Sequence, residues 1–163
     1  MGDKMKEFFK KIDWKYLIKI IVVTILIGSL FSFFIITNKD TYMMLDKPIN
    51  VPPALFGIVW TILYILMGIS YYIVSKSNDE KKKNALLIYW IQLGVNSLWT
   101  LIFFGFKSYL FAFIWLVLLI ILVGVMIAKF YNINKTSAYI QIPYLIWLLF
   151  AAYLNYGIYY LNK

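Results

Sequence analysis

The sequence predicts an all-α membrane protein, a bundle of five transmembrane helices. Of its 163 residues, 63% are apolar and only 14% are charged, whereas soluble domains average about 45–50% apolar and about 25% charged residues. Five long segments carry no charge: residues 20–38, 48–75, 84–106, 108–128 and 136–162. At roughly 19 residues or more, each can cross the hydrocarbon core of a bilayer. Their continuous apolar character excludes the alternating pattern of a membrane β-barrel.

All five helices belong to one domain, residues 1–163. We expect them at approximately 16–37, 53–75, 85–105, 109–130 and 138–161. Pro52 and Pro53 suit the start of the second helix, because a proline in the first turn lacks an amide hydrogen that would be unpaired there. Pro143 is expected to kink the fifth helix near its start by removing a backbone hydrogen bond. Residues 38–52 form the longest connection, which we interpret as a lid loop.

Lysine is the only basic residue type, and its distribution predicts the orientation. Twelve of the 16 lysines fall in the N-terminal segment 1–19, in 76–84 and in 129–137. Because basic residues favour the cytoplasmic side, we expect the N-terminus inside, and the lid loop and C-terminus outside, in a bacterial inner membrane. This topology accounts for the net charge of +9 without a nucleic-acid partner. Segment 1–19 itself is either an amphipathic lead-in on an anionic lipid surface or a solvated tail.

Several kinds of chemistry are excluded by composition. The chain contains no Cys and no His, which removes disulfides, thiol nucleophiles and the commonest metal ligands and general bases. The charge-free segments hold no carboxylate for acid–base catalysis. We therefore predict neither a metal site nor a resident cofactor.

A few aromatic and polar side chains stand out within the spans. Trp60 and Tyr64 lie one helical turn apart and share a face, so the lid loop and second helix form either a covered pocket or a simple helix entry at the membrane interface. Asn96 lies inside the third span, either as a hydrogen-bonding link between helices or as a polar anchor in an apolar pocket. Trp147 and Ala151 share a face of the fifth helix. That pairing is typical of core packing, and it also leaves room for a flat ligand.

Three motifs resemble the TspO/MBR family of tryptophan-rich sensory proteins and translocator proteins. The first-loop signature matches at Tyr42, Leu45, Lys47, Pro48, Pro52, Pro53, Trp60, Leu63, Tyr64, Met67 and Gly68. The third-helix motif N-x-x-[WF] with its following F-F matches at Asn96, Trp99, Phe103 and Phe104. The fifth-helix motif P-Y-L-x-W-x-x-F-A-x-x-L-N matches from Pro143 to Asn155. Thr41 and Asn50 replace two tryptophans of the family signature, and Trp115 stands at or near the position where many relatives carry an acid.

The resemblance implies an integral membrane receptor or translocator for a flat hydrophobic ligand. The ligand class it implies is a tetrapyrrole, such as protoporphyrin IX or haem, in an aromatic pocket under the lid loop. The implied site residues are Tyr42, Pro52, Pro53, Trp60, Tyr64, Asn96, Trp99, Phe103, Trp147 and Ala151. Since His and Cys are absent, we predict that porphyrin binding does not require iron.

Two other functions remain open at this stage. One is a light- and oxygen-dependent enzyme that degrades porphyrin, with Trp60 and Trp147 as its redox-active residues. The other is a stress-response scaffold or sensor without transport. Relatives are commonly dimers, so we also expect a homodimer. Gly124 and Ala128 give one small-residue face, a pattern too common in membrane helices to fix the interface.

Overall fold

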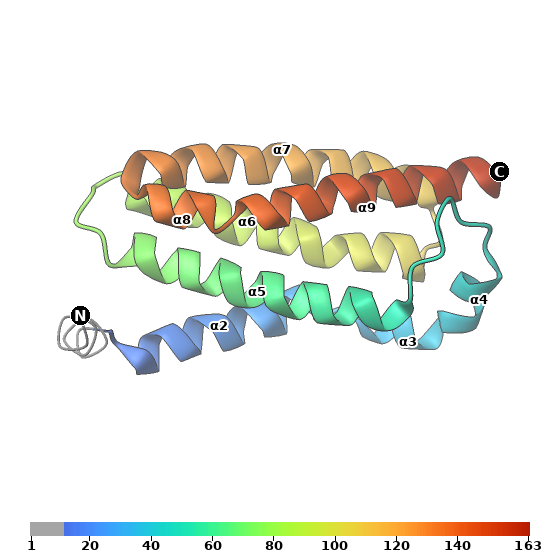
Figure 1. Ribbon diagram of the computed structural model, residues 1–163, viewed down its shortest axis with the longest axis horizontal. Helices are drawn as coiled ribbons and strands as arrows, with labels where there is room; N and C mark the ends of the chain where they lie inside the picture. The colour runs from blue at the N-terminus through green and yellow to red at the C-terminus, as the bar shows by residue number, and fades with distance from the viewer. Residues whose placement is uncertain (1–11) are drawn as a thin grey trace.

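The computed structural model describes residues 12–163 as helices and short connections, with no strand in that range. The helices run along one long axis (Figure 1). They are α2 (Trp14–Gly28), α3 (Phe33–Thr37), α4 (Lys39–Met44), α5 (Pro53–Ser75), α6 (Lys82–Thr100), the π-helical turn η1 (Leu101–Gly105), α7 (Tyr109–Ile133), α8 (Lys135–Tyr139) and α9 (Ile142–Leu161). Most of segment 1–19, the proposed lead-in, lies outside the described residues.

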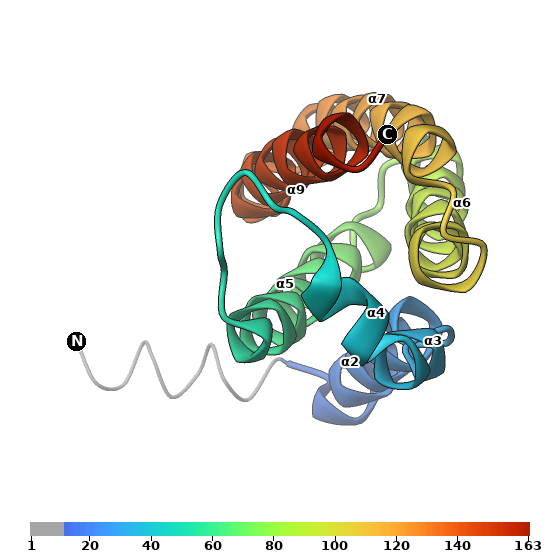
Figure 2. The same ribbon diagram turned by 90° about the vertical axis from the view of Figure 1, so that its right-hand side faces the viewer.

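Five helical spans are long and apolar enough to cross a membrane, which confirms the predicted fold class. They are Trp14–Thr37, Pro53–Ser75, Lys82–Gly105, Tyr109–Ile133 and Lys135–Leu161. Seen from one end, the spans form a ring in which α7 lies between α6 and α9, while α2 packs against α5 and α6 (Figure 2). The backbone of α5 approaches the fifth span mainly at α8 rather than at α9.

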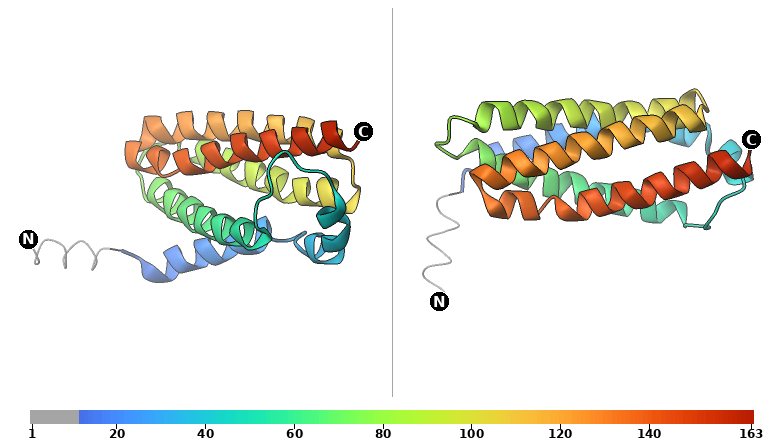
Figure 3. Two further views of the ribbon diagram at one scale, coloured as in Figure 1. Left: turned by 45° about the vertical axis from the view of Figure 1, so that its right-hand side comes forward. Right: turned by 90° about the horizontal axis from the view of Figure 1, so that it is seen from above.

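The two ends of the bundle differ in structure. The extended part of the first connection, the α4 helix, the turn between η1 and α7 and the C-terminus gather at one end, which we call the loop end (Figure 3). The connection between α5 and α6 and the start of α2 lie at the opposite end. At that opposite end Asp13 caps α2 by accepting from the Tyr16 amide, and it forms an ion pair of 3.1 Å with Lys76.

The first span is interrupted, contrary to the prediction of one helix over 16–37. Helix α2 ends at Gly28, and the chain turns through residues 29–32 before α3 begins. The last carbonyls of α2 accept hydrogen bonds from side chains of other helices. The Tyr64 hydroxyl donates to Gly28 O at 2.9 Å, and the Ser97 hydroxyl donates to Ile27 O at 2.7 Å. These bonds satisfy carbonyls that a helix end leaves free.

The lid loop is shorter than predicted, because α4 occupies Lys39–Met44 within the predicted loop 38–52. The ammonium of Lys47 donates to Met43 O at 3.2 Å and to Leu45 O at 2.8 Å, which satisfies carbonyls at the C-terminal end of α4. Only residues 45–52 are extended or turn-like, consistent with the backbone restriction that Pro48 places on its predecessor. The term first loop below means residues 45–52.

The other spans also differ from their predicted bounds. The third span starts at Lys82 rather than 85, and its last turn is the π-helical η1. The fourth continues to Ile133 rather than 130. In the fifth, the helix breaks between α8 and α9, so Pro143 lies in the first turn of α9. The expected distortion near Pro143 is therefore a break just before the proline.

Candidate ligand-binding site

Aromatic side chains of α5 and α9 pack against each other. Trp60 stacks on Tyr64 with ring centroids 5.5 Å apart and packs edge-on against Tyr144 at 6.2 Å. Trp147 packs edge-on against Phe56 at 5.7 Å. We call this group the α5–α9 cluster; it consists of Phe56, Trp60, Tyr64, Tyr144, Trp147, Phe150 and Ala151. Ala151 is buried beside it, while Trp60 and Trp147 are partly buried.

One polar atom in the α5–α9 cluster has no partner. The indole nitrogen of Trp147 is shielded from solvent and forms no hydrogen bond within residues 12–163. A buried donor without an acceptor costs about 1–3 kcal/mol relative to a satisfied one. A molecule that entered between α5 and α9 would reach the Trp147 N–H only after the side chains that shield it moved apart, and it could then accept from this N–H without breaking an existing bond.

Asn96 is central to a hydrogen-bonded network between three helices. Its Oδ1 accepts from the Tyr64 hydroxyl at 3.2 Å, and its Nδ2 donates to the Tyr144 hydroxyl at 2.9 Å. The Tyr144 hydroxyl in turn donates to Gln92 Oε1 at 3.0 Å. These bonds join α5, α6 and α9 in the buried core. Asn96 thus acts as a link between helices here, immediately beneath the α5–α9 cluster.

The predicted site residues fall into two groups rather than one. Tyr42, Trp99 and Phe103 contact one another in a second group that we call the α4–η1 cluster, although Trp99 also packs against the main core. Tyr42 packs against Phe104 at 5.6 Å and Phe103 at 6.3 Å, and Trp99 packs against Phe103 at 5.1 Å. The cluster consists of Tyr42, Leu45, Trp99, Phe103, Phe104 and Tyr109. Burial raises the pKa of the Tyr42 hydroxyl above its ordinary value.

The first loop is held against the end of α9. The side-chain oxygen of Asn162, Oδ1, accepts from the backbone amide of Asp46 at 3.0 Å. The side-chain nitrogen, Nδ2, donates to the backbone carbonyl of Asp46 at 2.8 Å. Pro48 packs so closely on Gly157 that a Cβ at that position would overlap the proline ring. The loop therefore crosses α9 at the loop end, while Pro52 and Pro53 are exposed at the start of α5.

Several of these contacts are absent from the sequence-based prediction. Tyr144 and Phe56 lie within the matched motifs, but nothing in their spacing indicates a ring contact with Trp60 or Trp147. Asn162 and Gly157 give no recognisable signal, because their partners are more than a hundred residues away along the chain.

Comparison with known proteins decides the family. The sequence model of the TspO/MBR family matches residues 20–161. The chain belongs to the TspO/MBR family. The tryptophan-rich protein TspO of Archaeoglobus fulgidus is 37% identical over 148 residues, which cover 90% of this chain and 96% of the relative. Protein CrtK of Rhodobacter capsulatus is 40% identical over 124 residues, which cover 74% of this chain and 78% of the relative. The human translocator protein is 35% identical over 119 residues, which cover 71% of this chain and 70% of the relative.

Trp115 is one of the positions at which this sequence differs from many members of the TspO/MBR family. Trp115 stands at or near the position where the resemblance places an acid in many relatives. Here its indole nitrogen donates to Val95 O at 2.8 Å, which ties α7 to α6. The Trp115 side chain therefore forms a hydrogen bond between α7 and α6 in this protein.

Proposed function

We propose that this multi-pass membrane protein binds a flat hydrophobic ligand between α5 and α9 and acts as its receptor or translocator. The single observation that carries the proposal is the shielded indole N–H of Trp147, which has no hydrogen-bond partner among residues 12–163 and lies among partly buried aromatic rings. The ligand class we propose is a tetrapyrrole, such as protoporphyrin IX or haem, and this choice rests on the family resemblance. The printed name of the human relative, translocator protein, agrees with the translocator part of this proposal.

The physical basis is stacking combined with recovery of one hydrogen bond. A flat aromatic ligand against Trp60 and Trp147 gains about 0.5–1.5 kcal/mol per ring pair beyond the burial of apolar area. An acceptor on the ligand that meets Trp147 Nε1 adds a further net contribution of about 1 kcal/mol. Ala151 is buried, and its small side chain occupies less of the space next to Trp147 than a larger residue would.

We propose that the ligand enters from the loop end, which the lysine distribution assigns to the outside of a bacterial cell membrane. The first loop covers this end of α9 through Asp46 and Pro48. A homodimer remains our expectation for the assembly. Its interface is unassigned, although a Cβ at Gly124 would meet no heavy atom within 4 Å and Ala128 is exposed.

The proposal predicts selective loss of affinity in the tryptophan variants. Purified protein in nanodiscs is titrated in the dark with protoporphyrin IX, followed by tryptophan fluorescence. We expect saturable quenching in the wild type, about fivefold weaker affinity for Trp147→Phe because one hydrogen bond of about 1 kcal/mol is lost, and weaker affinity for Trp60→Phe. Haem should titrate similarly, because the chain offers no His or Cys to the iron.

Trp90→Phe is the matched control. Trp90 packs edge-on against Tyr71 and Tyr89, away from the α5–α9 cluster, so its loss should leave the affinity unchanged. Equal weakening in all three variants, or quenching that never saturates, contradicts the proposed site. Illumination of the saturated samples in oxygen then tests degradation: bleaching that stops in Trp60→Phe or Trp147→Phe favours the enzyme alternative.

A further inference from the structure

Methionine supplies all the sulfur in this protein. The chain has six methionines and no cysteine, so a peroxide that oxidises sulfur can react here only at a thioether. Four of the six lie within the described residues: Met43, Met44, Met67 and Met126. A peroxide must touch the sulfur to react with it, so oxidation follows exposure. The exposure of these four side chains therefore decides where oxidation begins in the described part of the chain.

The four methionines lie in two opposite environments. Met44 is 85% exposed, the highest value among the large apolar side chains of residues 12–163, and Met43 is 54% exposed. Met67 on α5 and Met126 on α7 are both 0% exposed. The end of α4 thus presents two neighbouring thioether side chains, which we call the methionine pair, while the core encloses the other two.

The methionine pair lies in a segment that water reaches. Residues 38–52, which include α4, fall between the first two membrane spans. Charged side chains come before and after the pair, and those of Lys39, Asp40 and Asp46 are exposed. Charged groups stay out of hydrocarbon because burial there is costly. A small polar oxidant such as hydrogen peroxide therefore meets the pair from the aqueous side.

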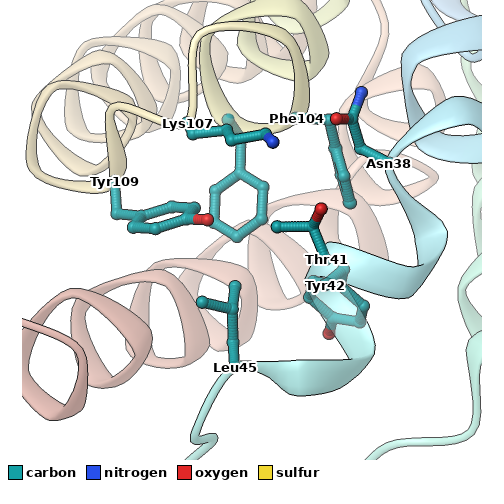
Figure 4. A pocket seen from close by; sticks show the side chains of 8 residues that line it. Asn38, Thr41, Tyr42, Leu45, Phe104, Lys107 and Tyr109 are labelled. Carbon is teal, nitrogen blue, oxygen red and sulfur yellow. The ribbon is translucent and has the colours of Figure 1, made fainter.

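The contacts that the structure gives α4 come from other groups than the two thioethers. The Tyr42 ring packs against Phe103 and Phe104. From α4, Thr41 and Tyr42 line the small hollow beside η1, and neither methionine does (Figure 4). Lys47 donates to the backbone carbonyl of Met43 and not to its side chain. An oxygen added to either sulfur of the pair leaves all of these contacts intact.

We propose that the methionine pair is a site of reversible oxidation by peroxides, and that it reacts before the other two described methionines. A sulfur of the pair attacks one oxygen of the peroxide, and the O–O bond breaks. That oxygen stays on the sulfur as a sulfoxide, and the other leaves as water once the proton has passed to it. Sulfur loses two electrons and the peroxide gains them. Methionine sulfoxide reductases restore the thioether. This site is independent of the proposed tetrapyrrole function.

The test is treatment of the full chain in nanodiscs with hydrogen peroxide in the dark, followed by peptide mass spectrometry. We expect the pair to gain oxygen at nearly the rate of free methionine. Met67 and Met126 should react about tenfold more slowly or less, because a buried sulfur reacts only during local opening. A mixture of the two epimer-specific reductases should then remove the added oxygen. The unfolding temperature of the pair-oxidised protein should equal that of the untreated protein.

The matched control carries Met43→Leu and Met44→Leu together. Leucine conserves the volume of methionine, so the fold should be kept while the oxygen gain of this peptide disappears.

Four results would overturn the proposal. Oxidation of Met67 or Met126 as fast as the pair shows that exposure does not direct the reaction. A pair that reacts far more slowly than free methionine shows that the bilayer shields it. A lower unfolding temperature after oxidation of the pair alone shows that the fold does not tolerate the sulfoxide. Added oxygen that both reductases leave in place shows that the modification is not reversible.

Discussion

Tyr144→Phe is expected to lower the free energy of unfolding by about 2 kcal/mol. The Tyr144 hydroxyl is the partner of both Asn96 Nδ2 and Gln92 Oε1, and Gln92 Nε2 is already unpaired within residues 12–163. Two buried polar groups left unsatisfied would cost about 1–3 kcal/mol each in water-soluble proteins. We expect the lower end of that range, because separated membrane helices find other partners. The loss is measured by thermal unfolding in detergent, followed by near-ultraviolet circular dichroism.

Tyr153→Phe is the matched control for this change. Tyr153 is on the same helix, α9, but its side chain is exposed and no hydrogen bond involves it within the described part of the chain. We expect the unfolding temperature of the Tyr153→Phe variant to equal that of the wild type. If both variants lose the same stability, or neither loses any, the network around Asn96 does not hold α5, α6 and α9 together.

Gly68→Ala is expected to destabilise the protein by about 1–3 kcal/mol, the usual cost of overpacking a core. A Cβ at Gly68 would lie 2.9 Å from Ile21 Cα and 2.7 Å from Ile21 Cγ1. The first of these atoms is backbone, so the clash is relieved only if α2 and α5 move apart. Small residues allow such close approach of membrane helices. Thermal unfolding measures the effect.

Gly94→Ala provides the opposite expectation. A Cβ at Gly94 would meet no heavy atom within 4 Å, so only the helix-forming preference of alanine counts, a gain of about 0.5–1 kcal/mol. The two substitutions are chemically identical and both lie inside spans. Destabilisation by Gly94→Ala, or none by Gly68→Ala, would contradict the close contact of α2 with α5.

The five spans were predictable because their signal is local. A long continuous segment without charged residues predicts a membrane-spanning helix, whichever other helices it packs against. The break after Gly28 was not predictable, because the groups that replace its helical bonds come from Tyr64 and Ser97, on other helices. The α4 helix was missed for a related reason: its C-terminal carbonyls are satisfied by Lys47, which the sequence shows only as a charge in a loop.

The candidate site was predictable in its residue types but not in its arrangement. The motif that contains Tyr42 and Trp60 suggested that both residues line one site. In the structure Tyr42 lies on α4 and packs against Phe103 and Phe104 instead. Asn96 was open to two interpretations, and its two tyrosine partners show that its amide links helices. Whether these residues also bind ligand stays a prediction. That the indole N–H of Trp147 has no partner among the described residues is a result of packing, so no sequence pattern could have indicated it.

The most direct test of the central claim is the nuclear magnetic resonance signal of the Trp147 indole N–H. The protein is labelled with ¹⁵N at its six tryptophans, and the Trp147 signal is assigned by its absence in Trp147→Phe. With saturating protoporphyrin IX, we expect its proton signal to move downfield and its exchange with deuterium to slow, because a new hydrogen bond forms. The signals of Trp99 and Trp115, already bonded to Asn155 and Val95, should change little. A Trp147 signal that keeps its position and its exchange rate at saturation would contradict a ligand between α5 and α9.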